Sequence, residues 1–129
     1  MNEPEWILRE TVLALQEQSL ALFGGLGGIR DEGMLDSALQ RPVNLFAYGQ
    51  PDVFELASAY AFGLAKNHPF FDGNKRIAFI TAIVFLELNG KHFHASEPDA
   101  VIRTLALAAG EMGEADYAQW LRDHSSPQP

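Results

Sequence analysis

The sequence predicts a single all-α domain, and three observations support this fold class. Helical signals dominate, with apolar residues recurring at amphipathic spacing in several long segments. Side chains that favour helix N-termini stand before several of these segments, and glycine or proline often follows them. No strong run of alternating polar and apolar residues indicates a β-strand. The 129 residues suit one domain, and an apolar fraction of 47% is enough for a hydrophobic core.

Two helices are expected in the first third of the chain. Residues 6–23 carry a loosely amphipathic pattern that should end at the glycine-rich segment 24–28. This segment follows a helix and lacks the Gly-Lys-Ser/Thr ending of a P-loop, so we interpret it as a helix-terminating turn. Asp31 is expected to cap a short second helix. Pro42 should stop that helix, because the residue before a proline is biased away from the helical conformation.

Two long helices should form the centre of the domain. Asp52 is the predicted N-cap of residues 53–67, whose many Ala, Leu, Phe and Tyr residues predict burial. Another helix is expected over residues 73–88, with Gly90 as its C-terminal stop. From Ile77 onward this helix is apolar on nearly every face, so it should be the central, enclosed helix of the bundle.

The remaining residues predict a connector, two helices and a tail. Residues 91–95 should form a short, extended connector. Ser96, with an acidic residue three positions later, resembles a capping box. The helix that Ser96 opens should run through about residue 109, and a last helix is expected over residues 114–122. We assign residues 1–124 to the domain and expect the Ser- and Pro-rich residues 125–129 to be a disordered tail.

Composition and charge exclude several classes of protein. The net charge of −8 and the sequence pI of about 4.8 argue against a general nucleic-acid binder, which needs a basic face. The absence of cysteine excludes disulfides and thiolate metal sites. The acidic first residues do not resemble a secretory signal, and the longest apolar-rich run is too short to span a bilayer. We therefore expect a cytoplasmic protein that contacts neither membranes nor nucleic acid directly.

The start of the expected central helix carries an unusual concentration of positive charge. Lys75 and Arg76, which follow Asn74, are the only adjacent basic residues in the chain. Cations near the positive end of a helix dipole are unfavourable by about 0.3–1 kcal/mol each at exposed sites. An anion at this end would balance them, because free main-chain N–H groups, the flexible Gly73 and two cations form a phosphate cradle. The first turn therefore predicts a phosphate-binding site.

Two further reactive side chains precede this cradle. Pro69 biases His68 toward an extended conformation, so the chain should turn before Asp72, with Phe70 or Phe71 anchoring the turn in the core. A histidine can accept a proton from a hydroxyl, and a carboxylate beside phosphates is a natural magnesium ligand. Such a loop would suit phosphoryl or nucleotidyl transfer. On the residues alone, Asp72 as an ordinary helix cap and His68 as a hydrogen-bonded loop residue remain open alternatives.

The same segment resembles the signature of a known protein superfamily. Its nine residues match His-Pro-Phe-x-Asp-Gly-Asn-x-Arg, the Fic-superfamily motif, at each specified position. AMP-transferring members carry Gly between Asn and Arg, whereas the Doc (death on curing) toxins carry Lys, as this chain does at Lys75. The similarity extends to segments outside the motif, namely residues 24–33, 45–49 and 85–90. The chain is thus identified as a member of the Doc branch, with a compact Fic/Doc-type helical bundle.

The resemblance implies an activity and roles for individual residues. It implies a type II toxin that uses ATP and Mg²⁺ to phosphorylate elongation factor Tu and so inhibits translation. His68 would be the base that acts on the target hydroxyl, and Asp72 would hold magnesium. Gly73, Asn74 and Arg76 would bind phosphate, and Lys75 would block the phosphate pocket of AMP transferrers, so that ATP presents its γ-phosphate. AMP transfer and a non-enzymatic inhibitor that acts by binding alone remain the alternatives.

Three further expectations come from the superfamily. A flap preceding the motif aligns the target by main-chain pairing, and Leu45, Phe46 and Tyr48 are the candidates for it, with simple core packing as the competing interpretation. AMP transferrers usually carry a second Arg three residues after the first, where this chain has Phe79. Many relatives carry His where this chain has Gln16, to which the sequence assigns no role.

A regulatory partner is also expected. Self-inhibited members of the superfamily carry a Ser/Thr-x-x-x-Glu-Gly/Asn helix, and this pattern is not recognisable here. A toxin without this element should be restrained by a partner. The resemblance implies that this partner is a Phd-type antitoxin, whose C-terminal segment would fold into an apolar groove expected beside Leu15 and Leu22.

Overall fold

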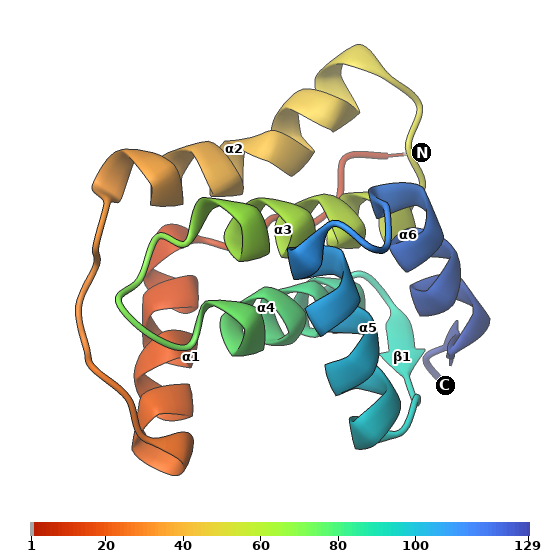
Figure 1. Cartoon of the computed structure of the whole chain (residues 1–129). Coiled ribbons are helices and arrows are strands. Elements are labelled where there is room, and N and C mark those ends of the chain that lie inside the picture. Colours follow the sequence, from red (N-terminus) through yellow and green to blue (C-terminus); the bar gives the residue numbers. More distant parts are fainter. Residues whose placement is uncertain (1) are drawn as a thin grey trace.

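The computed structural model describes residues 2–129, which form six α-helices and two short strands (Figure 1). The expected all-α class is confirmed, because the two strands make only one small antiparallel ribbon. In chain order the elements are α1 (Arg9–Phe23), α2 (Glu32–Tyr48), α3 (Val53–Asn67), α4 (Asn74–Leu88), β1 (Lys91–Phe93), α5 (Glu97–Ala109), α6 (Glu114–Asp123) and β2 (Ser125–Pro127).

Helices α3 and α4 lie side by side at the centre, and the other helices surround them (Figure 1). Asp52 caps α3 as expected, through a reciprocal capping box with Glu55. The central helix α4 buries Ile77, Phe85 and Leu86 against its neighbours. The expected enclosed helix after the motif is therefore present, and it gives the motif loop between α3 and α4 a rigid support.

Helix α2 is longer than the sequence predicted. Its N-cap is Asp31, whose side chain accepts the Met34 N–H as expected, but the helix continues through Pro42 instead of stopping there. Pro42 is buried on the same face as Ala38, and the helix changes direction along its length (Figure 1). Ala38 packs on Gly63 of α3, where an added Cβ would lie 3.1 Å from the Ala38 Cα. This close packing against α3 stabilises a helix that local preference would end.

The C-terminal residues are ordered, so the expected disordered tail is wrong. Residues Ser125–Pro127 form β2, which pairs with β1 in antiparallel register. The side chain of Gln128 donates to the carbonyls of Glu87 and Lys91. Main-chain hydrogen bonds of this kind do not depend on side-chain composition, which is why a Ser- and Pro-rich sequence gave no sign of them.

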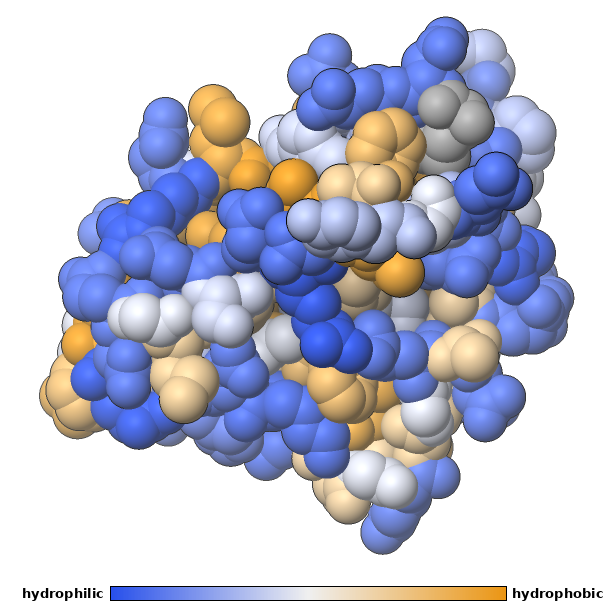
Figure 2. All heavy atoms as spheres, turned by 90° about the horizontal axis from the view of Figure 1, so that it is seen from above, coloured by the Kyte–Doolittle hydropathy of each residue, from blue (hydrophilic) through white to orange (hydrophobic). Residues whose placement is uncertain are grey.

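The surface is largely hydrophilic. Polar residues cover most of the face seen from above in Figure 2, with smaller apolar areas between them. No helix within residues 2–129 is both long and apolar enough to cross a membrane.

Candidate active site

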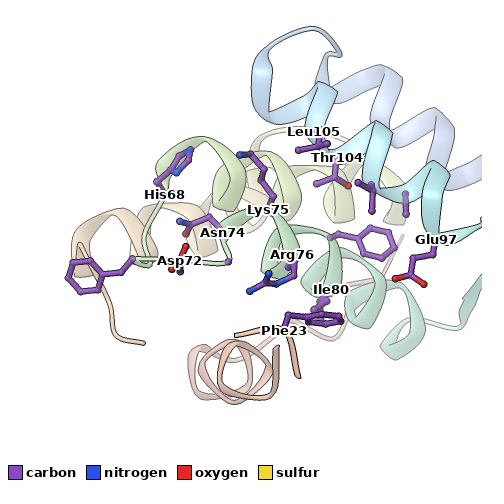
Figure 3. Close-up of a pocket in the computed structure, with 15 residues that line it drawn as sticks. Phe23, His68, Asp72, Asn74, Lys75, Arg76, Ile80, Glu97, Thr104 and Leu105 are labelled. Carbon is purple, nitrogen blue, oxygen red and sulfur yellow. The ribbon is translucent and has the colours of Figure 1, made fainter. Parts of the chain in front are cut away.

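A cavity of about 730 Å³ opens at the N-terminal end of α4. The motif loop forms one end of it, and side chains of α4 and α5 line the remainder, with Phe23 from the end of α1 (Figure 3). Its volume lies in the range of small-molecule sites. His68, Asp72, Lys75 and Arg76 all line this cavity, so the structure brings the residues predicted from the motif together.

His68 has an unexpected main-chain conformation. It is the C-cap of α3 and has φ 48° and ψ 55°, in the left-handed region, whereas Pro69 had predicted an extended residue. Among residues 2–129 it is the only non-glycine residue with positive φ. The left-handed turn ends α3 and leaves the exposed His68 at the cavity, while Phe70 is buried and anchors the loop as expected.

Asp72 is not a helix cap, so this alternative is wrong. The N-cap of α4 is Gly73, with φ 74° and no side-chain cap hydrogen bond. Instead, Asp72 Oδ2 accepts the main-chain N–H of Leu26, at 3.0 Å, and so connects the glycine-rich segment to the motif loop. Within residues 2–129 no three His, Asp or Glu side chains form a group that could hold a metal ion. One carboxylate nevertheless fits magnesium that is shared with substrate phosphates and water.

The side chain of Asn74 holds the motif loop, a contact that the sequence did not predict. Its side chain is buried and makes two hydrogen bonds to the main chain of Phe70: Nδ2 donates to the carbonyl and Oδ1 accepts the N–H, both at 2.9 Å. The amide therefore shapes the motif loop. The main-chain N–H groups of the first turn of α4 are left for an anion, because this helix has no capping side chain.

The two cations of the motif occupy different environments. Lys75 is exposed, and within the part of the chain that the structure describes it forms no ion pair. Arg76 is directed by the end of α1: its Nε donates to Ser19 Oγ and its Nη2 to the Gly24 carbonyl, each at 3.1 Å. Its guanidinium also lies over the Phe23 ring, 5.2 Å from the centroid. Two cations thus meet the N-terminus of α4 at one end of the cavity.

The structure contradicts the expected flap. Leu45, Phe46 and Tyr48 lie in the last turn of α2, where the main chain is helical and offers no extended edge to a target strand. Phe46 instead packs edge-on against Trp6, which is the competing interpretation.

Residues outside the motif position the loop, and the sequence did not assign them. Gln16 of α1 is only 3% exposed, and its Nε2 donates to the Asp72 carbonyl at 2.7 Å. Its Oε1 is buried and has no hydrogen-bond partner within residues 2–129. Gln16 and Ser19 lie on the buried face of α1 with Val12. Polar residues in an otherwise apolar stripe were the available signal for this role.

The fold and the site define a class of protein. The family model described as "Fic/DOC family" matches residues 6–86. The chain therefore belongs to the Fic/Doc family, and the resemblance inferred from the motif is confirmed.

Two relatives narrow the comparison within this family. The chain is 33% identical over 114 residues to a protein of Escherichia phage P1 named "Protein kinase doc", a match that covers 88% of this chain and 90% of that protein. It is 43% identical over 89 residues to "Toxin Doc" of Mycolicibacterium smegmatis, covering 67% of this chain and 65% of that protein.

Proposed function

We propose that the protein is the toxin of a type II toxin–antitoxin system and an ATP-dependent protein kinase. It transfers the γ-phosphate of ATP to a serine or threonine hydroxyl of a translation factor of the elongation factor Tu class and thereby inhibits translation. The observation that carries the proposal is the cavity in which His68, Asp72, Lys75 and Arg76 converge. The names of the two relatives, a kinase and a toxin, support it. The target class follows from the resemblance to the Doc toxins.

The distribution of charge and apolar surface in the cavity suits a nucleotide. At the motif end, Lys75, Arg76 and the N-terminus of α4 can bind phosphate oxygens. Farther along the cavity, Phe79 of α4 and Val101 and Leu105 of α5 provide an apolar lining for the base. A phosphate-binding end beside an apolar section fits ATP with its phosphates toward His68.

The chain's own residues account for the proposed reaction. His68 accepts the proton of the target hydroxyl while the hydroxyl oxygen forms a bond to the γ-phosphorus. The bond between that phosphorus and the oxygen that bridges it to the β-phosphate breaks, and ADP leaves with this oxygen. Lys75 and Arg76 stabilise negative charge on the phosphates. Magnesium held by Asp72 would supply further charge neutralisation.

The test is incubation with elongation factor Tu and ATP labelled at either the γ- or the α-phosphate. Transfer of the γ-label to the factor supports the kinase, and transfer of the α-label would replace it with AMP transfer. If neither label is transferred although the protein binds the factor, inhibition by binding alone would replace both.

Lys75→Gly should change the direction in which ATP binds. If Lys75 fills the phosphate pocket that AMP transferrers use, its removal should lower γ-phosphate transfer by about 10²-fold, the order expected for loss of one charge-stabilising group. Some α-label transfer should appear, kept low because Phe79 stands where AMP transferrers have a second Arg. The same two labelled substrates measure both activities.

The control for this variant is Lys91→Gly, which removes a lysine of β1 that does not line the cavity. It should leave γ-phosphate transfer unchanged. Wild-type γ-transfer by Lys75→Gly would show that Lys75 does not set the orientation of ATP.

A Phd-type antitoxin is the proposed partner. Exposed apolar side chains border the cavity on both sides, with Phe23 on α1 and Val101 and Leu105 on α5. Leu22 is also exposed, whereas Leu15 packs partly against the core, so the exposed apolar surface of α1 lies nearer its C-terminal end than expected. A segment that folds on this surface could offset its ordering cost by apolar burial.

Co-expression tests this partner. The chain should arrest growth when it is produced alone and should become harmless, and co-purify, with the product of the adjacent small gene. Harmless production of soluble, folded wild-type chain in a sensitive bacterial host would contradict the toxin proposal.

A further inference from the structure

Arg30 makes an unusual set of contacts with the motif loop. It lies in the exposed segment between α1 and α2, which runs beside the loop joining α3 to α4 (Figure 1). Its Nε donates to the His68 carbonyl at 2.7 Å, and its Nη2 donates to the Asn67 carbonyl at 2.9 Å. Its main-chain N–H donates to the Pro69 carbonyl at 2.7 Å. One residue therefore binds three successive carbonyls around the proposed base.

The carbonyls of Asn67 and His68 lie at the C-terminal end of α3, which leaves them without helical partners. The last carbonyls of a helix have no intrahelical donor and carry the negative end of its dipole, where a cation is favourable. His68 itself is in the left-handed region, which is unfavourable for a residue with a Cβ. A guanidinium that bonds both the Asn67 and the His68 carbonyls favours this turn over a continued helix, because in a continued helix both carbonyls would accept main-chain N–H groups four residues farther on.

The hydrogen bonds of the Arg30 side chain differ from the contacts that four other arginines make. Arg9, Arg41, Arg103 and Arg122 each form an ion pair with a carboxylate in the part of the chain described by the structure. Arg30 forms none of these ion pairs, and its side-chain hydrogen bonds go to main-chain carbonyls. Charge pairing on the surface therefore does not account for its position.

We propose that Arg30 is a positioning residue for His68: its guanidinium holds the left-handed turn at the end of α3 and so directs the imidazole into the cavity. The catalytic part of this inference rests on the proposed kinase function. The contact also fixes residues 28–31 against the motif loop, since Ile29 and Phe70 form an isolated antiparallel bridge beside it.

The experiment compares Arg30→Met, Arg30→Lys and the control Arg9→Met in the γ-phosphate transfer assay. Methionine keeps an unbranched apolar stem and removes every donor, whereas lysine keeps the charge without the fork. For Arg30→Met we expect kcat to fall about 10- to 100-fold, because a small displacement of a reacting group has effects of this order. KM for ATP should stay within about twofold of the wild type, because Arg30 does not line the cavity.

The two other variants separate positioning from charge and from general stability. Arg30→Lys should recover only part of kcat, and full recovery would show that charge alone suffices, contrary to the proposal. Arg9→Met removes a partly exposed arginine that pairs with Glu32 and Asp36, and it should keep wild-type kcat. All assays are run well below the thermal midpoint of the least stable variant, so that loss of folded protein does not mimic loss of kcat. Wild-type kcat in Arg30→Met would overturn the inference.

A measurement without substrate keeps the inference distinct from the proposed function. The main-chain NMR shifts of His68 and Pro69 should change in Arg30→Met and remain in place in Arg9→Met. If the wild-type chain transfers no phosphate, the proposed kinase function fails, and these shifts decide whether Arg30 sets the conformation of His68. Unchanged shifts would reject the positioning role.

Discussion

Replacing His68 with alanine is expected to lower γ-phosphate transfer by about 10²–10⁴-fold, the usual cost of losing a general base. The fold should survive, because His68 is exposed and its side chain fills no part of the core. The rate is measured with γ-labelled ATP and elongation factor Tu, and growth after induction gives a second readout. Producing the variant should not arrest growth, although the variant remains soluble.

Two further variants make this result specific to the imidazole. His94→Ala removes an exposed histidine that does not line the cavity, and it should remain active. His68→Gly removes the imidazole but suits the positive φ of 48°, so it should be as inactive as His68→Ala while unfolding at higher denaturant concentration. Growth arrest by soluble His68→Ala protein would remove His68 from the proposed mechanism.

Replacing Asn74 with alanine should have the largest effect on stability among the polar residues of the motif. The side chain satisfies both the N–H and the carbonyl of buried Phe70. Without it both groups lose their partner, and each unpaired buried group costs about 1–3 kcal/mol. The free energy of unfolding should therefore fall by about 2–6 kcal/mol, as measured by urea denaturation.

Asn44→Ala is the matched control for this prediction. Asn44 is an exposed residue of α2, and its side chain accepts one hydrogen bond, from Gln40. Its removal should change the free energy of unfolding by no more than about 0.5 kcal/mol, as is usual at the surface. An equally small effect of Asn74→Ala would mean that the amide does not hold the Phe70 main chain.

The features of the fold that could be predicted are those decided by local sequence. The N-caps Asp31, Asp52 and Ser96 were all located correctly, because each bonds a main-chain N–H only three residues away. The buried central helix was also predictable, because from Ile77 onward nearly every residue of α4 is apolar and the helix has no distinct polar face. The motif placed His68 and Asp72 near the cations for the same reason: all lie within nine consecutive residues.

The features that could not be predicted depend on contacts between distant residues. Pro42 stays in a helix because α2 packs closely on α3, and His68 adopts a left-handed conformation in contact with Arg30, 38 positions away. Gln16 reaches Asp72 across 56 positions. Each of these contacts overrides or adds to a local preference, and a single sequence does not state which distant residues will meet.

The ribbon of β1 and β2 has a consequence for the order of folding. Its strands are separated in sequence by α5 and α6, so pairing them closes a long loop. Closing this loop costs conformational entropy, so we expect the strands to pair only after those helices have formed. Helix α5 supplies one wall of the cavity, whereas the motif loop is held by α1, α3 and α4 and by the segment before α2. The phosphate-binding end should thus assemble early from neighbouring segments. The wall that receives the base is fixed late, when the last residues of the chain pair with β1.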